Sequence, residues 1–155
     1  MRMGVRIGID VGKVRIGVSR SDLHGMLATP VETVARSEDA ADRRRIARIV
    51  DELEAVEVIV GLPLALSGAR TASTDDAVAF ARSLAGEVGV PVRMVDERLT
   101  TMSASSALRA SGKNSKKARP VVDQVAATII LQHALDAERA TGRPPGDPVE
   151  TSIGP

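Results

Sequence analysis

The sequence predicts an α/β fold in which helices flank one mixed β-sheet. Two β-branched runs at residues 5–10 and 14–19, separated by a short Gly-containing segment, are typical of a β-hairpin. After the hairpin, short aliphatic runs alternate with segments of helical periodicity, which indicates parallel strands joined by right-handed crossovers. The 155 residues are enough for a single domain with one core.

Each element has its own pattern. Pro30 favours an edge strand or a bulge in the third strand. The first helix carries Ile46, Ile49 and Val50 at helical spacing, and Thr74 is expected to cap the second helix. We expect strands at residues 5–10, 14–19, 26–35, 56–61 and 91–96, and helices at residues 40–55, 75–87, 101–110 and 119–141.

The C-terminal segment differs from the rest of the chain in composition. Residues 142–155 contain four of the eight prolines and are expected to be a disordered tail. Residues 1–141 are therefore expected to form the single domain.

Composition excludes several kinds of site. The chain has no cysteine, which rules out a disulfide framework, a thiolate zinc site and a cysteine nucleophile. Asp10, Lys13 and Arg15 interrupt the apolar character of the N-terminal segment, and no window reaches the roughly 18 apolar residues of a membrane helix. We therefore expect a cytoplasmic protein with no membrane partner.

Two carboxylate positions are predicted to converge at one edge of the sheet. Asp10 ends the first strand, and Asp96 and Glu97 end the fifth. Because ligands bind outside the carboxyl ends of parallel strands in open α/β sheets, both positions face one crevice. The intervening strand ends in Gly-Leu-Pro, which adds no acid and little bulk between them.

A third carboxylate, Asp123, begins the apolar face of the last expected helix. An acid on such a face is costly unless a cation or a metal ion meets it. The alternative is a carboxylate at a helix start that interacts favourably with the helix dipole. Periodicity alone does not choose between these two interpretations.

Three carboxylates without a cysteine suit a hard divalent cation, Mg²⁺ or Mn²⁺, better than zinc. His24 and His133 are interpreted as structural or solvated side chains rather than ligands. Paired divalent ions would support attack of water on a phosphodiester. The pattern therefore favours hydrolytic nuclease chemistry.

The opening segment GIDVGKVRIG places glycines beside two cations. One interpretation is that Gly8, Gly12 and Gly17 allow a phosphate backbone to approach the hairpin while Lys13 and Arg15 neutralise it. The alternative is that these glycines serve only as turn and bulge residues.

Four blocks of the sequence together resemble the YqgF family, also called RuvX, of the RNase H-like superfamily: GIDVGKVRIGVS, IVGLPLALSG, VDERLTT and VDQVAATIILQHAL. The resemblance covers about residues 5–135 and implies an RNase H-like fold, with a five-stranded sheet of order 3-2-1-4-5. It also implies that Asp10, Glu97 and Asp123 are the catalytic, metal-binding set. Alternation along the strand sends the side chains of Asp96 and Glu97 to opposite faces, and the resemblance favours Glu97.

The resemblance also implies residues that contact substrate. Arg98, Thr100 and Thr101 follow Glu97 in the family pattern and are expected to hold phosphate or to fix the loop, with helix capping as the alternative for the threonines. Basic runs are otherwise typical of solvated surface, and we interpret the arginines at residues 43–48 as such a surface or as a helix face that extends the nucleic-acid footprint. The residues expected to bind nucleic acid are Lys13, Arg15, Arg98, Thr100, Lys113, Lys116 and Lys117.

The function implied by the resemblance is a metal-dependent endonuclease acting on structured nucleic acid. Processing of the 5′ end of pre-16S ribosomal RNA is the first hypothesis. Resolution of Holliday junctions in branched DNA is the alternative, and it predicts a homodimer with paired sites. Because the chain has no Trp or Tyr, recognition of backbone shape is favoured over base stacking.

Two other function classes agree with part of the sequence. The opening Asp-x-Gly also resembles the phosphate loop of actin-like and sugar-kinase ATPases, but those proteins enclose a nucleotide between two such domains. A non-catalytic nucleic-acid-binding module would keep the fold and lose acids, whereas all three expected acids are present.

Overall fold

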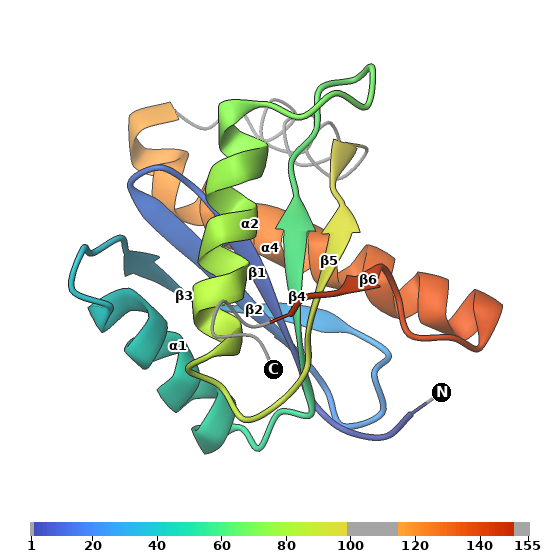
Figure 1. Cartoon of the computed structure of the whole chain (residues 1–155). Coiled ribbons are helices and arrows are strands. Elements are labelled where there is room, and N and C mark those ends of the chain that lie inside the picture. The colour runs from blue at the N-terminus through green and yellow to red at the C-terminus, as the bar shows by residue number, and fades with distance from the viewer. Residues whose placement is uncertain (1, 99–114, 151–155) are drawn as a thin grey trace.

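A computed structural model of the chain describes residues 2–98 and 115–150, without the side chains of residues 115–121 (Figure 1). Its described strands form one sheet of order β3-β2-β1-β4-β5-β6. The described elements are β1 (Arg6–Val11), β2 (Arg15–Ser21), β3 (Ala28–Ala35), α1 (Ala41–Glu52), β4 (Glu57–Leu62), α2 (Ala72–Ala85), β5 (Val92–Asp96), α4 (Ser115–Thr141) and β6 (Asp147–Pro148).

The sheet is mixed, as expected. Strands β1, β2 and β3 form an antiparallel meander, whereas β4 and β5 continue the sheet parallel to β1. The predicted order 3-2-1-4-5 is confirmed, with β6 added antiparallel at the β5 edge. Pro30 lies in edge strand β3 opposite Ser19, so it occupies an edge strand next to the point where the pairing register shifts.

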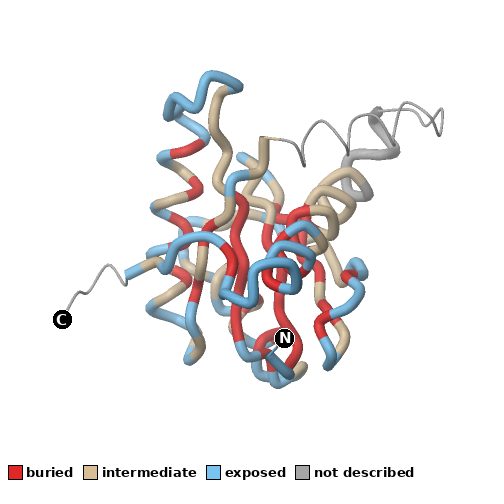
Figure 2. The backbone as a smooth tube through the Cα atoms, turned by 90° about the vertical axis from the view of Figure 1, so that its right-hand side faces the viewer, coloured by how far each residue is buried: buried red, intermediate tan, exposed pale blue. Residues whose placement is uncertain are grey.

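Helices cover both faces of the sheet. In Figure 1, α1 and α2 lie in front of the strands and α4 lies behind them. Alternation along β4 divides the core accordingly, since Val58 and Val60 pack in the cluster with α1 and α2 while Ile59 packs with Ile130 and Leu131 of α4. Figure 2 shows this buried material concentrated in the central strands and the helix faces turned to them.

Helix boundaries differ from the expectation in one informative place. Helix α2 begins earlier than predicted because Thr71, not Thr74, is its N-cap. Thr74 still takes part, since its hydroxyl accepts a hydrogen bond from the Thr71 backbone in a capping box. The expected helix at residues 101–110 lies outside the described residues.

The C-terminal segment departs from the predicted disorder. Residues 142–150 run along the sheet edge, where Val149 N donates to Val92 O at 2.8 Å and the Arg93 guanidinium donates to the carbonyls of Pro145 and Gly146. Prolines are compatible with an edge strand because one side of such a strand needs no ladder donors. Composition therefore misjudged this segment up to residue 150.

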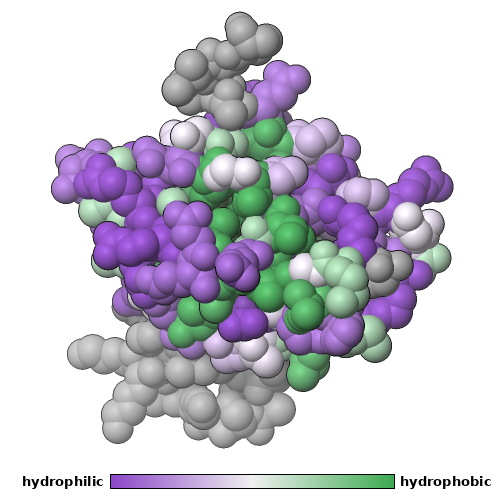
Figure 3. All heavy atoms as spheres, turned by 90° about the horizontal axis from the view of Figure 1, so that it is seen from below, coloured by the Kyte–Doolittle hydropathy of each residue, from purple (hydrophilic) through white to green (hydrophobic). Residues whose placement is uncertain are grey.

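The end of the sheet opposite the carboxyl ends of β1 and β4 has an apolar surface. Figure 3 shows apolar side chains gathered on this underside and surrounded by polar ones. The exposed large apolar side chains of this end are Met3, Leu23, Met26, Leu27 and Val56. No helix within the described residues is both long enough and apolar enough to cross a membrane.

Candidate active site

Two of the expected carboxylates lie at the carboxyl ends of parallel strands. Asp10 is near the end of β1, and Glu97 directly follows β5, where its backbone N–H donates to Leu62 O of β4 at 3.2 Å. A Cβ atom on Gly61 would stand 2.1 Å from Glu97 Oε2, so the missing side chain makes room for this carboxyl group. Glu97, rather than Asp96, turns its carboxyl group to this part of the sheet.

The third carboxylate, Asp123, arrives from helix α4 because glycines let the helix backbone approach the sheet. A Cβ atom on Gly17 would stand 1.9 Å from Asp123 O, and one on Gly8 would stand 2.9 Å from Ala127 O. The hydroxyl of Ser19 donates to Ala127 O at 2.8 Å and holds the helix there.

These contacts correct the interpretation that the glycines open the hairpin to phosphate. Gly8 and Gly17 are covered by α4 itself. Gly12 belongs to the turn, where its N–H donates to Arg15 O at 2.9 Å, in agreement with the turn alternative. Gly8 and Gly17 therefore allow α4 to pack closely on the sheet, and Gly12 forms part of the turn.

The surroundings raise the pKa of two of the three carboxyl groups. Burial, and then the charge of Asp123, raise the pKa of Asp10 from its ordinary 3.8 to about 6. Burial, followed by the charges of Asp10 and Asp96, raises the pKa of Glu97 from 4.5 to about 8. Glu97 Oε2 is buried without a hydrogen-bond partner in the described part of the chain. The negative charges of ionised Asp10 and Glu97 are thus poorly stabilised by their surroundings.

Asp123 has a cationic partner. The Arg15 Nε donates to Asp123 Oδ2 at 3.0 Å, and both side chains are partly exposed. Sequence reasoning named both residues but did not pair them, because they lie 108 positions apart in the chain. Among residues 2–98 and 115–150, no group of three or more His, Cys, Asp or Glu side chains is arranged to hold a metal ion.

Comparison with known proteins shows which family this chain resembles. The RuvX family model, described as "Holliday junction resolvase", matches residues 4–137. The chain belongs to the RuvX family. A protein of Leifsonia xyli subsp. xyli named "Putative pre-16S rRNA nuclease" is 78% identical over 155 residues, which is 100% of both chains. A Streptomyces coelicolor protein of the same name is 53% identical over 154 residues, covering 99% of this chain and 92% of the relative.

A solved structure shares the fold. The structure of Thermus thermophilus RuvC in complex with Holliday junction substrate matches with a TM-score of 0.55, at 20% identity, and covers 94% of this chain and 99% of that one. This likeness confirms the expected RNase H-like fold.

The remaining predicted residues of this RuvX-family chain are distributed unevenly. Lys13 is exposed at the hairpin tip and lines a cavity of about 410 Å³ with Val14 and Arg36. Arg98 donates to Asp96 at 2.9 Å and to Leu66 O at 3.3 Å, so it contacts the loop, and its contact with phosphate stays a prediction. Three predicted residues lie outside the described residues, namely Thr100, Thr101 and Lys113, as do the side chains of Lys116 and Lys117.

The structure also reveals positioning residues that sequence reasoning missed. Arg36 donates to Gly12 O at 2.8 Å and to both carboxylate oxygens of Asp76, and its guanidinium lies 5.2 Å from the centroid of the Phe80 ring. It thereby ties the hairpin turn to α2. No local pattern signals this role, because Gly12 lies in the hairpin turn and Asp76 and Phe80 lie on α2, all far from Arg36 in the chain.

Proposed function

We propose that this chain is a divalent-metal-dependent endonuclease of the cytoplasm that hydrolyses phosphodiester bonds in structured RNA and processes the 5′ end of pre-16S ribosomal RNA. The observation that carries the proposal is the gathering of Asp10, Glu97 and Asp123 at one edge of the sheet, with the first two held at raised pKa. Acids placed at such cost are typical of functional sites. The names of the 78% and 53% identical relatives support the RNA substrate.

The donor set fits a hard cation in its chemistry. The side chains of Asp10, Glu97 and Asp123 are not arranged around an ion site in the described part of the chain, and they would have to move closer together to hold Mg²⁺ or Mn²⁺. Glu97 Oε2, which is buried without a hydrogen-bond partner among the described residues, is an oxygen that a cation would satisfy. When bound, such an ion neutralises charge on the phosphate and activates water. Because the pKa values of Asp10 and Glu97 are raised, these carboxyl groups would bind protons when no metal ion is bound. Binding of the metal ion would therefore release protons.

The cations at the same edge would position the substrate. Arg15 is paired with Asp123 and would exchange this carboxylate for a substrate phosphate. Lys13, at the hairpin tip, would neutralise a second phosphate. The family pattern extends this set to Thr100, Lys113, Lys116 and Lys117, and salt-sensitive binding would follow from all of these contacts.

Holliday junction resolution is the second candidate. It is favoured by the description of the matching family model and by the fold shared with RuvC, whose structure was solved with a junction. Cutting two strands symmetrically would require a homodimer with paired sites.

Cleavage by the wild type and by Asp10→Asn tests the proposal. Both would be assayed with Mg²⁺ and with Mn²⁺ on labelled pre-16S RNA carrying its 5′ extension and on a four-way DNA junction. We expect Asp10→Asn to lose at least about a hundredfold in rate, because a metal ligand is removed. Asp51→Asn, an exposed carboxylate on α1, is the matched control and should cleave like the wild type.

The rates on the two substrates decide between the candidates. Faster cleavage of the RNA supports ribosomal RNA processing, and faster cleavage of the junction supports resolution. If neither metal gives cleavage of either substrate, the nuclease proposal is wrong, and salt-sensitive binding alone would favour a binding module.

A further inference from the structure

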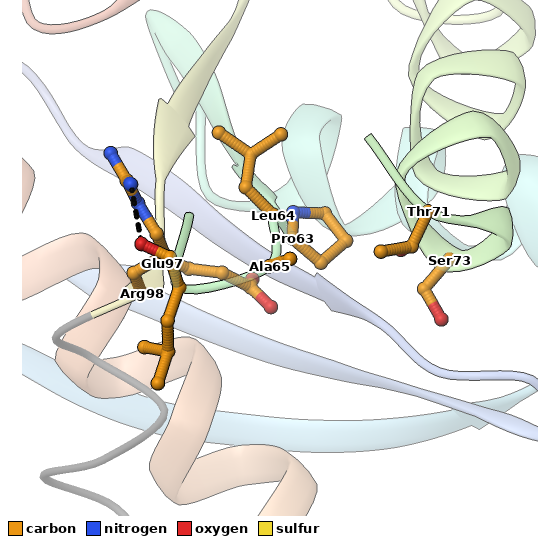
Figure 4. A pocket seen from close by; sticks show the side chains of 8 residues that line it. Pro63, Leu64, Ala65, Thr71, Ser73, Glu97 and Arg98 are labelled. Carbon is orange, nitrogen blue, oxygen red and sulfur yellow. Dashed lines mark hydrogen bonds between the residues drawn. The ribbon is translucent and has the colours of Figure 1, made fainter. Parts of the chain in front are cut away.

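A cavity of about 410 Å³ opens directly beside Glu97 (Figure 4). Figure 4 shows the β4–α2 loop, with Pro63, Leu64 and Ala65, between Glu97 on one side and the start of α2 on the other. The volume falls within the roughly 300–1,000 Å³ typical of small-molecule sites. The lining residues are Pro63, Leu64, Ala65, Leu66, Thr71, Ser73, Glu97 and Arg98.

The loop wall of this cavity is held in place by hydrogen bonds. Within the loop, Ala65 N donates to Ala69 O at 3.0 Å and Gly68 N donates to Ala65 O at 2.7 Å. At its base, the Thr74 hydroxyl donates to Pro63 O, and across the cavity Arg98 donates to Leu66 O. The cavity is therefore pre-formed, which lowers the ordering cost of binding.

The lining disfavours a phosphate. Among the described residues of the lining, Arg98 alone is cationic, and its guanidinium is already paired with Asp96 at 2.9 Å. Glu97 adds a carboxyl group that would repel an anion when ionised. Four consecutive lining residues of the loop, Pro-Leu-Ala-Leu, are apolar.

The chemistry of the lining instead suits a flat apolar ring with polar edges. Leu66, at 77% exposure, is the most exposed large apolar side chain in the described part of the chain, and it lines this cavity. Ser73 is exposed on the opposite wall, and its hydroxyl makes no hydrogen bond within the described residues. Aliphatic side chains and proline can cover a ring in a chain that has no Trp or Tyr.

We propose that this cavity binds one unstacked nucleobase of the substrate, next to the phosphodiester that lies at Asp10 and Glu97. Leu66 and the Pro-Leu-Ala segment cover the faces of the ring, and the Ser73 hydroxyl meets its edge. The inference rests on the proposed nuclease function and deepens it. It requires a nucleotide outside a base-paired stack at a fixed distance from the cut.

A double-mutant cycle between protein and substrate tests this. The probe is the pre-16S RNA with its 5′ extension, made intact and with single abasic nucleotides at each position close to the cut. Binding is measured with the Asp10→Asn protein so that cleavage does not interfere. We expect one abasic position to weaken binding by about five- to tenfold, and Leu66→Ser to weaken binding of the intact RNA about fivefold.

The decisive result is the combination. Leu66→Ser should change binding of that abasic RNA by less than about twofold, because its partner is already missing. Ser73→Leu places a larger side chain in the cavity. We expect it to lower the affinity for intact RNA to the affinity that the wild-type cavity shows for the abasic RNA. The matched control is Leu23→Ser, at an exposed leucine on the underside, which should leave the binding of both RNAs unchanged.

Two results overturn the inference: no abasic position weakens binding, or Leu66→Ser weakens intact and abasic RNA equally. Wild-type cleavage with either of these results leaves the nuclease proposal standing and removes only the base site. Absence of cleavage contradicts the proposed function, while the binding cycle with Asp10→Asn still decides whether the cavity takes a base.

Discussion

At the scale of single residues, the acids of the candidate site are kept at a cost to stability. Asp10 and Glu97 are half-buried near other carboxylates, and their pKa values of about 6 and about 8 lie above the ordinary 3.8 and 4.5. The folded protein therefore binds more protons than the unfolded chain between about pH 4 and pH 8. Stability contributed by these groups is present at low pH and is lost as the pH rises through this window.

Glu97→Gln is expected to stabilise the metal-free protein at pH 8 and not at pH 4. The uncharged amide removes the cost of burying an ionised carboxylate and, after it, the repulsion by Asp10 and Asp96. A shift of this size corresponds to a gain on the order of 3 kcal/mol in the free energy of unfolding. Denaturant titrations of both proteins in EDTA at the two pH values provide the measurement. A variant less stable than the wild type at pH 8 would contradict the raised pKa of Glu97.

At the scale of elements, the site depends on how closely α4 lies against the β1–β2 hairpin. Gly17 pairs with Asp10 across the two strands and lies under the backbone of Asp123, so one missing side chain brings two acids together. Ser19 and Gln124 add hydrogen bonds to this interface, to Ala127 O and from the Gln124 amide to Thr33.

Gly17→Ala is expected to push α4 away from the sheet. The new methyl group would meet the carbonyl of Asp123, and backbone cannot rotate aside as a flexible side chain can. We expect the free energy of unfolding to fall by about 3 kcal/mol, with cleavage lost in parallel. Thermal unfolding and cleavage assays would be compared with Gly89→Ala, where a Cβ atom meets nothing within 4 Å. Equal behaviour of the two variants would refute the close-packing argument.

At the scale of the whole molecule, the C-terminal segment closes an edge of the sheet. Strand β6 covers β5, whose outer N–H and C=O groups would otherwise be open to other chains. Arg93 secures the segment through two carbonyls, and Gly146 adopts φ +66° where a side chain would stand 2.0 Å from Met94 O.

Truncation after Thr141 is expected to lower the free energy of unfolding by about 2 kcal/mol, since several partly buried hydrogen bonds are lost. The bared β5 edge should also promote association, which light scattering would detect alongside thermal unfolding. Truncation after Glu150 keeps every contact described here and serves as the control. A disordered tail, as composition predicted, would leave both truncated proteins as stable as the full chain.

By itself, the sequence determined the order of elements, the apolar face of the last helix, and the acids at the strand ends. Periodicity and strand ends are local properties, so Asp10 and Glu97 could be placed at one edge from pattern and topology. The resemblance to a family added the strand order and chose Glu97 over Asp96.

Only the tertiary structure decided which residues meet. Three contacts join segments that are distant in the chain or lie on different elements. They are the contact of Gly17 with the backbone of Asp123, the ion pair of Arg15 with Asp123, and the hydrogen bond from Arg98 to Leu66 O in the β4–α2 loop. The ordered edge strand in a proline-rich segment depends in the same way on the neighbouring β5. The distance between two side chains depends on how their elements pack against each other in three dimensions. The amino-acid sequence contains both residues of each contact, but it does not contain the distance between them.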